Sequence, residues 1–367
     1  MKIALFIADF TSGGAERVYV NLAQEFTERG HNVDLVIGNA HNAVYLNELP
    51  HSVRVIDLKV ARMLKSLPQL TKYLCEHKPD VLMATRVHSC CFCVLAKILT
   101  RVKTGIVLRE ANTVSLDLGK YSWKRKMLLG LSIRILYPLS DAMIGVSAGV
   151  VNDLNKRLPG TQKKVHLVYS PIITDDLFAK ASEPVNHRWF KNNSIPVILS
   201  AGRLTEQKKF DVLIRAFSIV RQKVNSRLLI LGEGELRKNL EALVAELGLK
   251  NDVQLFGFDP NPFKFMAHSS LFVMSSAWEG LPGVLIQALA CGCPVVSTDC
   301  PSGPREILKD GRLGKLVPVG DVQAMASAMA EALKQEPQRV SEEDLGEYTA
   351  RKATDHYLRV LDSARKA

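Results

Sequence analysis

The sequence predicts an α/β protein made of two tandem domains, each with a doubly wound parallel sheet, that face each other across a cleft. The chain has 367 residues, 47% of them hydrophobic, which exceeds one ordinary core and fits two domains. Short apolar runs alternate with segments of helical periodicity. This alternation restarts after a polar stretch at residues 174–194. We therefore expect two Rossmann-like domains.

In the first domain, residues 1–170, helices are expected from Ala15, near 61–77 and near 90–101. Apolar residues recur at helical spacing after Ala15, and Gly30 is typical of a residue that ends a helix in the left-handed conformation. Strands are expected at KIALFIA, VDLVIG, VRVIDL, DVLMA, TGIVLRE, DAMIGVS and KVHLVYS.

A linker is expected at residues 171–194, followed by a second domain at 195–340. Helices are expected from 208, from 235 and over Val284–Cys291. Strands are expected at PVILSAG, SRLLILG, DVQLFGF, LFVMSS and CPVVSTD. The last segment, 341–367, is expected to form a helix that packs back on the first domain.

Charge and composition limit the possible partners. The net charge is +11, and residues 1–170 carry 23 basic against 13 acidic side chains, whereas the remaining residues carry 25 against 24. A basic first half favours an anionic lipid surface or an anionic substrate. Nucleic acid is not expected, because no binding motif or basic stretch with interleaved aromatics accompanies the charge.

No apolar run reaches the roughly 18 residues of a membrane span, and the start of the chain lacks the features of a signal peptide, so a cytoplasmic protein is expected. The cysteines fall mostly in apolar runs and are expected to be reduced and structural. The cluster Cys90, Cys91 and Cys93 lies beside His88 but lacks the second ligand pair of a zinc site, so no metal is expected.

The run from Phe272 to Pro304 is the most informative segment for function. A short strand ends near residue 274, turn residues follow, and Glu279 lies just before a buried helix. Free backbone N–H groups at such a helix start suit phosphate or sugar oxygens, and a carboxylate there can accept from sugar hydroxyls. The alternative is that Glu279 only caps the helix.

Residues 200–211, SAGRLTEQKKFD, place Arg203 and Lys208 between the end of the first strand of the second domain and the next helix. Arg203 and Lys208 are suited to stabilise a diphosphate leaving group as a glycosyl bond breaks. A solvated surface charge is the alternative, and it fits Lys209 better.

Glycine-containing loops follow three strands. Gly13 and Gly14 lie between the first strand and the first helix, where their backbone amides can approach a phosphate or a hydroxyl, although a tight turn alone also favours glycine. The segments LGEGE at 231–235 and FGF at 256–258 are weaker signals of the same kind.

Together these segments resemble the retaining glycosyltransferases of family 4, which have the two-domain GT-B fold, over almost the whole chain. The resemblance rests on Gly13-Gly14, on Gly202-Arg203-Leu204 with Lys208, and on Glu279 in the same order and spacing. It implies a nucleotide-sugar, with UDP favoured, bound in the second domain, an acceptor bound in the first, retention of anomeric configuration, and neither a cofactor nor an obligatory metal. The implied catalytic residues are Glu279, Arg203 and Lys208, and the implied nucleotide-sugar residues are Gly13, Gly14, Gly202, Gly232, Gly257, Phe258, Gly280, Leu281, Pro282, Gly283 and Gln287.

The sequence departs from the family pattern at two positions. Gln287 stands eight residues after Glu279, where a second Glu is usual, and this loses charge assistance to the ribose hydroxyls. Lys209 replaces a usual Gly, which is expected to alter the loop backbone. No first-domain His aligns securely with that of relatives; His88 and Glu110 are the candidates for contacting the acceptor or the reacting sugar, and a buried structural role is the alternative for His88.

The segment from Lys120 to Pro138 combines basic residues with Trp123 and a long apolar face. This composition is typical of a helix that lies on an anionic membrane, and the broken stretch 61–74 is similar; a core helix with a solvated basic face is the alternative. Relatives that contain segments like GGAER at 13–17 and DCPSGPRE at 299–306 often extend bacterial surface polysaccharides, lipopolysaccharide or lipid-linked glycans. We therefore expect a glycan or lipid-linked glycan acceptor, with the protein at the inner face of the plasma membrane. An isomerase or hydrolase of nucleotide-sugars on the same fold, and a catalytically silent binding protein, remain the alternatives.

Overall fold

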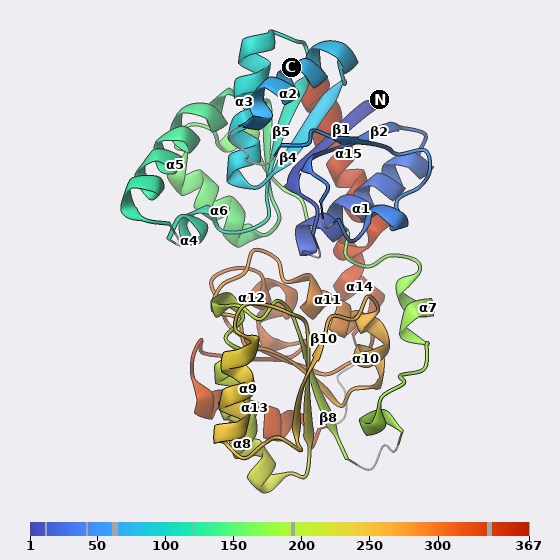
Figure 1. Cartoon of the computed structure of the whole chain (residues 1–367), viewed down its shortest axis with the longest axis vertical. Helices are drawn as coiled ribbons and strands as arrows, with labels where there is room; N and C mark the ends of the chain where they lie inside the picture. Colours follow the sequence, from blue (N-terminus) through green and yellow to red (C-terminus); the bar gives the residue numbers. More distant parts are fainter. Residues whose placement is uncertain are drawn as a thin grey trace. The chain divides into compact units, whose positions relative to one another are not determined.

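The computed structural model divides the chain into two compact units, Met1–Ile172 with Glu347–Ala367, and Ile173–Gly346 (Figure 1). Each unit contains one sheet in which all strand pairs are parallel. This confirms the predicted fold class of two Rossmann-like domains. The structure describes residues 1–11, 13–41, 43–60, 65–119, 121–191, 195–335 and 340–366.

The sheet of the first unit has the strand order β3-β2-β1-β4-β5-β6-β7. Its strands are β1 Lys2–Asp9, β2 Asn32–Asn39, β3 Arg54–Asp57, β4 Val81–Thr85, β5 Gly105–Glu110, β6 Ala142–Gly145 and β7 Val165–Leu167. The central strand β1 is apolar on both faces, as expected for a parallel strand covered by helices on both sides. Because the chain leaves β1 for β2 on one side and returns to β4 on the other, the order reverses between β1 and β4.

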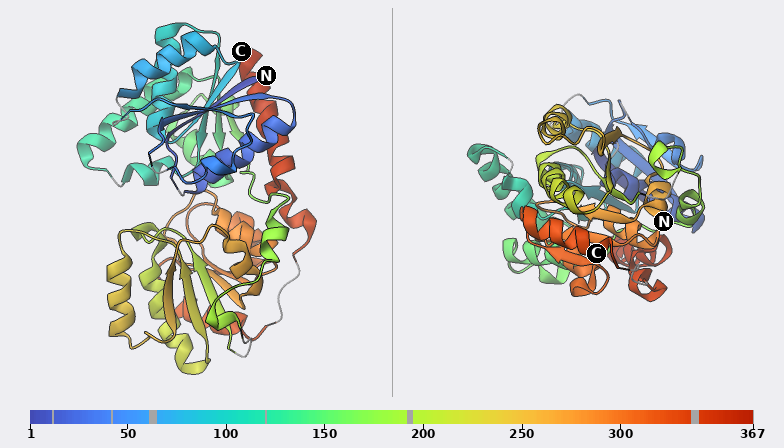
Figure 2. Two further views of the ribbon diagram at one scale, coloured as in Figure 1. Left: turned by 45° about the vertical axis from the view of Figure 1, so that its right-hand side comes forward. Right: turned by 90° about the horizontal axis from the view of Figure 1, so that it is seen from below.

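Helices cover both faces of this sheet. They are α1 Gly14–Glu28, α2 Ser66–His77, α3 Val87–Thr100, α4 Val114–Gly119, α5 Trp123–Leu136, α6 Ala148–Arg157 and α15 Ala350–Lys366. Figure 2 shows α1 and α15 on one side of the sheet and α2 and α3 on the other. The helix α1 ends as expected, because Gly30 has φ +77° and its N–H donates to the carbonyl of Thr27.

The C-terminal helix α15 belongs to the first unit. Its Tyr357 is fully buried, and the Tyr357 hydroxyl accepts a 2.8 Å hydrogen bond from the Nε of Arg109 on β5. The same guanidinium donates to Ser170 Oγ at 2.7 Å, just before the chain leaves the unit. Arg109 therefore joins strand β5 of the sheet both to helix α15 and to the segment around Ser170.

The sheet of the second unit has the order β10-β9-β8-β11-β12-β13. Its strands are β8 Val197–Ala201, β9 Arg227–Leu231, β10 Val253–Gly257, β11 Leu271–Met274, β12 Val295–Thr298 and β13 Lys315–Val317. Its helices are α7 Leu177–Ala181, α8 Phe210–Lys223, α9 Arg237–Glu246, α10 Pro262–His268, α11 Gly283–Ala290, α12 Pro304–Ile307, α13 Val322–Ala332 and α14 Glu342–Leu345. Here the order reverses between β8 and β11.

The structure differs from the expected boundaries in several places. The segment 171–194, expected as a linker, contributes α7 to the second unit, where Asn261 of α10 donates to the carbonyl of Lys180. The unit also extends to Gly346 rather than to residue 340. The helices α4, α6, α10, α12 and α13 and the strand β13 were not expected. Residues 61–64 of the predicted helix 61–77 lie outside the described residues, and that helix is found from Ser66.

Candidate functional site

The candidate site lies at the carboxyl edge of the second sheet. In a parallel sheet all carboxyl ends meet at one edge, and ligands bind where the strand order reverses. That point lies between β8 and β11. The loop after β8 carries Arg203 and Lys208, and the loop after β11 carries Glu279. The topology therefore brings to one edge the two loops that carry the three residues assigned to catalysis from the sequence.

Lys208 and Glu279 form an ion pair in which Nζ and Oε1 are 2.6 Å apart. Their side chains are only 16% and 9% exposed. Charges removed from water interact more strongly than surface charges, and each depends on its partner. The pair therefore joins the two loops and fixes a carboxylate and an ammonium group side by side.

The turn before Glu279 is also bound by its neighbours on the β8 loop. The Nε2 of buried Gln207 donates to the carbonyl of Trp278 at 2.8 Å, and the N–H of Ala277 donates to the carbonyl of Gln207 at 2.8 Å. The hydroxyl of Ser275 donates to the carbonyl of Lys208 at 2.7 Å. The position of Glu279 is thus set by several hydrogen bonds as well as by the ion pair, and the sequence analysis missed these supporting residues.

Glycines allow the loops of this edge to approach one another. Gly232 has φ +135°, and a Cβ there would lie 2.0 Å from the carbonyl oxygen of Gly202. A Cβ on Gly234 would lie 2.4 Å from the carbonyl oxygen of Leu204. The N–H of Gly232 donates to the carbonyl of Gly257 at 2.7 Å. Only glycine fits at positions 232 and 234, where it lets the neighbouring loops pack closely.

The helix α11 begins at Gly283, after Glu279-Gly280-Leu281-Pro282, one residue earlier than expected. The hydroxyl of Ser302 donates to the carbonyl of Gly280 at 2.9 Å, which holds the turn against the loop after β12. Gln287 lies half-buried one turn inside the helix. The start of the helix and its polar side chain therefore belong to the same edge as the ion pair.

Two predicted binding residues extend outward from this edge. Arg203 is exposed, and within the described ranges its side chain makes no hydrogen bond or ion pair. Phe258 is 46% exposed directly after β10. An exposed cation and an exposed ring are available for a ligand, whereas Lys208 and Glu279 already contact each other.

The first-unit candidates lie in different environments. His88, on the first turn of α3, is half-buried; burial, and secondarily the charge of Arg125, lowers its pKa, and its Nε2 lies 3.4 Å from Nη2 of Arg125. Glu110, at the end of β5, is 3% exposed and accepts a hydrogen bond from the hydroxyl of Tyr137. Burial raises the pKa of Glu110 to about 8. In this structure the Glu110 carboxyl is therefore engaged inside the first unit, not presented at its surface.

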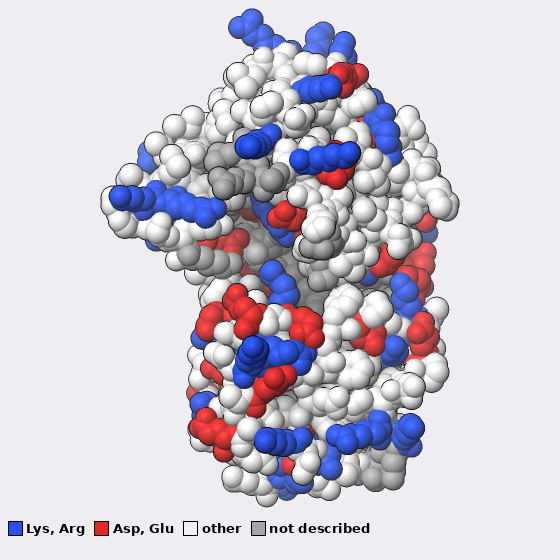
Figure 3. Space-filling view, viewed as in Figure 1, with Lys and Arg blue, Asp and Glu red and all other residues white. Residues whose placement is uncertain are grey.

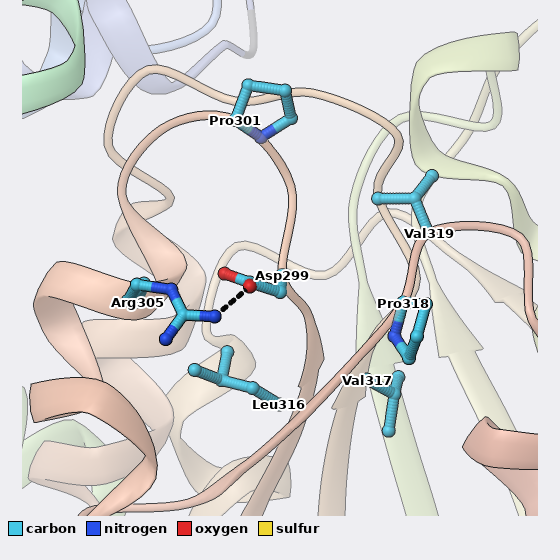
Figure 4. Close-up of a pocket in the computed structure, with 7 residues that line it drawn as sticks. All are labelled: Asp299, Pro301, Arg305, Leu316, Val317, Pro318 and Val319. Atoms are coloured by element: carbon cyan, nitrogen blue, oxygen red, sulfur yellow. Dashed lines mark hydrogen bonds and ion pairs between the residues drawn. The ribbon is translucent and has the colours of Figure 1, made fainter.

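A separate hollow of about 560 Å³ lies at the ends of β12 and β13 (Figure 4). Asp299 and Arg305 face each other in it as an ion pair, and the rest of the lining is apolar or proline. None of the predicted site residues lines it. Its one cation is already neutralised, so it does not compete with the β8–β11 edge as an anion site. Among the described residues, no group of three or more His, Cys, Asp or Glu side chains is arranged to hold a metal ion.

Comparison with known proteins agrees with this geometry. The family model "Glycosyl transferases group 1" matches residues 185–352, and the model "Glycosyltransferase Family 4" matches residues 12–176. A Campylobacter jejuni protein named N-acetylgalactosamine-N,N'-diacetylbacillosaminyl-diphospho-undecaprenol 4-alpha-N-acetylgalactosaminyltransferase is 31% identical over 355 residues, which cover 92% of each chain. The lipopolysaccharide core biosynthesis glycosyltransferase LpsE of Rhizobium meliloti is 27% identical and covers 96% of each chain.

Solved structures show the same fold. The apo form of the lipopolysaccharide outer core galactosyltransferase WaaB has a TM-score of 0.72 at 21% identity and covers 99% of both chains. Anabaena HepE in complex with UDP also has a TM-score of 0.72, at 18% identity, covering 100% of this chain and 98% of its own. Both likenesses extend over both units, so the two-sheet architecture is common to all three proteins.

Proposed function

Because the chain belongs to the family 4 type of bacterial glycan glycosyltransferases with the GT-B fold, we propose that it transfers a sugar from a UDP-sugar to a lipid-linked or surface-glycan acceptor with retention of configuration. The family assignment rests on the full-length similarity to the Campylobacter enzyme. The choice of acceptor class draws on the names of that relative and of LpsE. The choice of UDP draws on the sequence resemblance and on the UDP complex of HepE.

The observation that carries the proposal is the buried contact between Lys208 and Glu279 at the β8–β11 switch point. In the proposed reaction Arg203 and Lys208 bind the diphosphate, and Glu279 accepts hydrogen bonds from the donor sugar. The leaving diphosphate gains charge as the glycosyl bond breaks, so cations fixed beforehand stabilise the transition state more than the ground state. The base would lie near Phe258, and Gln287 would accept from ribose through its amide oxygen without charge assistance.

Retention is proposed to follow from displacement on the face that the leaving group departs from. In that step the acceptor hydroxyl oxygen forms the new bond to the anomeric carbon as the bond to the diphosphate breaks, and the diphosphate takes the hydroxyl proton. The cations named above supply the charge stabilisation, and no metal ion or cofactor is part of the proposal.

Calorimetric titration with UDP, GDP, ADP and NAD tests the donor assignment. UDP is expected to bind selectively and to lose about tenfold or more in affinity in Arg203→Ala. Glu279→Ala is expected to keep UDP binding and to lose turnover. Arg215→Ala, an exposed arginine on α8, is the matched control and should bind UDP normally. Preference for NAD, or no nucleotide binding, would contradict the proposal.

A product assay with and without acceptor separates the alternatives. A transferase needs the acceptor for turnover, whereas an isomerase or hydrolase consumes the UDP-sugar without it. A silent binding protein binds UDP but shows no turnover with any acceptor.

We further propose that the first unit docks on an anionic membrane through α5. No helix among the described residues is long and apolar enough to cross a bilayer. In α5 only Leu129, Ile133 and Leu136 are buried. Its apolar side chains that are more than half exposed are Trp123, Met127, Leu128, Leu131 and Ile135.

The helices α4 and α5 form an arm that projects from the rest of the first unit (Figure 2), and Figure 3 shows basic side chains along this arm. Exposed Lys124, Arg125, Lys126 and Arg134 accompany the apolar residues; Lys120 lies outside the described residues. Such exposure does not fit a core helix with a solvated basic face, and it suits insertion among lipid head groups with attraction to anionic lipid.

Co-sedimentation with vesicles tests this docking. Wild type should bind vesicles that contain phosphatidylglycerol and should bind pure phosphatidylcholine much less. The double variant Leu128→Ser/Leu131→Ser should lose binding. Phe178→Ser, which removes an apolar side chain that is 57% exposed in the second unit, should leave binding unchanged. Equal binding by all three proteins would exclude α5 as the docking surface.

A further inference from the structure

A second constellation lies at the carboxyl edge of the first sheet, where the strand order reverses between β1 and β4. It consists of Asp9 at the end of β1, Glu16 in the first turn of α1 and Arg86 directly after β4. Ligands of doubly wound sheets bind at this kind of position. The sequence analysis named the glycines of this loop but neither Glu16 nor Arg86.

Glu16 is a buried carboxylate, only 1% exposed. Its Oε1 accepts a 2.5 Å hydrogen bond from Nη2 of Arg86 and lies 3.4 Å from Oγ1 of Thr11. Its Oε2 has no hydrogen-bond partner in the part of the chain that the structure describes. Burying a carboxylate costs free energy unless it is paired; the ion pair with Arg86 satisfies one oxygen of Glu16, and the other stays buried without a protein partner among the described residues.

Gly13 makes room for this carboxylate. A Cβ on Gly13 would lie 2.4 Å from Glu16 Oε2, whereas a Cβ on Gly14 would meet nothing within 4 Å. The two glycines are therefore not equivalent. The first is required by Glu16, and the second leaves open space in front of α1.

Arg86 has an unusual backbone conformation, with φ 72° and ψ 135°. A side chain other than glycine is strained there, and such strain persists where surrounding contacts enforce it, often at binding sites. The side chain of Arg86 is held by its charged hydrogen bond to Glu16. The Arg86 side chain is 40% exposed, and its Nη1 lies 3.6 Å from Oδ2 of Asp9, whose side chain is 62% exposed.

We propose that Arg86 and Asp9 bind hydroxyl groups of the acceptor sugar and that Glu16 is a positioning residue that acts through Arg86. This inference rests on the proposed glycosyltransferase function. Two carboxylates and one guanidinium give the cluster a formal charge of −1, which disfavours a phosphate. An exposed donor beside an exposed acceptor matches neighbouring hydroxyls, which both donate and accept. The recognised group is therefore a neutral sugar ring.

Saturation-transfer NMR with free N-acetylgalactosamine and galactose as probes, in the presence of UDP, tests the inference. Wild type should transfer saturation to at least one of these sugars. Asp9→Asn, Arg86→Met and Glu16→Gln should each lose about tenfold in sugar affinity, while Arg86→Lys keeps part of it. Arg101→Met, an exposed arginine just beyond α3, is the matched control. All of these variants should bind UDP with unchanged affinity.

The outcomes are distinguishable. If the wild-type protein does not bind UDP, the proposed function itself is refuted. Three outcomes with normal UDP binding overturn the inference alone. They are the absence of any sugar signal, sugar affinity that is unchanged in the Asp9 and Arg86 variants, and binding of inorganic pyrophosphate at Arg86 in place of sugar. The steric step has its own test, since Gly13→Ala should lower the thermal unfolding midpoint and Gly14→Ala should not.

Discussion

The Lys208–Glu279 pair offers the sharpest quantitative prediction. Lys208→Met removes the cation and leaves the Glu279 carboxylate, whose side chain is 9% exposed, without its 2.6 Å partner. Breaking a buried ion pair costs about 3–5 kcal/mol, and the 16% exposure of Lys208 lets water replace part of the interaction. We therefore expect a loss of about 2–4 kcal/mol in the free energy of unfolding of the second unit.

The pairwise contribution is isolated by a double-variant cycle. Glu279→Gln alone leaves the ammonium unpaired, and Lys208→Met/Glu279→Gln leaves neither charge. The double variant should therefore lose about 2 kcal/mol less than the sum of the two single variants. The comparison cancels changes in packing that are common to the single and double variants.

The assay must report on the second unit, because two units need not unfold together. The chain has three tryptophans, and Trp189 and Trp278 lie in the second unit. In a Trp123→Phe background, urea unfolding followed by tryptophan fluorescence therefore reports on that unit. A coupling below about 0.5 kcal/mol would show that the pair is a solvated contact and would refute the reasoning.

Three further predictions follow from single residues. Lys209→Gly should raise the free energy of unfolding by about 0.5–1 kcal/mol, because Lys209 has φ 47° and this left-handed conformation costs more for lysine than for glycine. A lower free energy of unfolding in chemical denaturation would contradict this. Burial raises the pKa of Glu110 to about 8 in the folded state, so the unfolded chain releases this proton at lower pH. The free energy of unfolding should therefore fall as pH rises from about 5 to 8, by up to about 1.4 kcal/mol per pH unit. Glu110→Gln should remove this slope in denaturation measured across that range, and an unchanged slope would exclude Glu110 as its source. Tyr357→Phe removes the acceptor for Arg109 Nε and should destabilise the first unit by about 1.5–3 kcal/mol, with faster amide hydrogen exchange in α15; unchanged exchange would show that the hydroxyl does not secure the helix.

The fold could be predicted from the sequence because its signals are local. Buried parallel strands such as β1 appear as continuous apolar runs, and Gly30 marks the end of α1. The weaker elements have no such signal. The strand β13 has three residues, and α13 is rich in alanine and methionine, with Asp321 as an N-cap that accepts from the N–H of Ala324. The N-cap Asp321 is a helix signal in the sequence, but α13 was not predicted from it.

Site residues could be proposed from the sequence only where they lie in a loop that follows a recognisable strand. Arg203 after β8 and Glu279 after β11 were proposed in this way, and their roles stay predictions. Gln207 and Ser275 were missed because they act on backbone carbonyls distant in sequence, and such contacts exist only after folding. Glu16 was missed for a related reason, since a glutamate in the first turn of a helix normally indicates a favourable dipole contact and says nothing about burial.

Lys209 shows how the contacts around a loop can override the residue in it. Its substitution for glycine was expected to alter the loop backbone. Yet Lys209 lies in the left-handed region, at φ 47° and ψ 44°, which is a conformation that glycine adopts readily. The neighbouring contacts explain this, because the carbonyl groups of Gln207 and Lys208 are both bound by the turn that carries Glu279. The position of Lys208 is therefore dictated by the β11 turn, and the lysine at 209 bears the strain of meeting it.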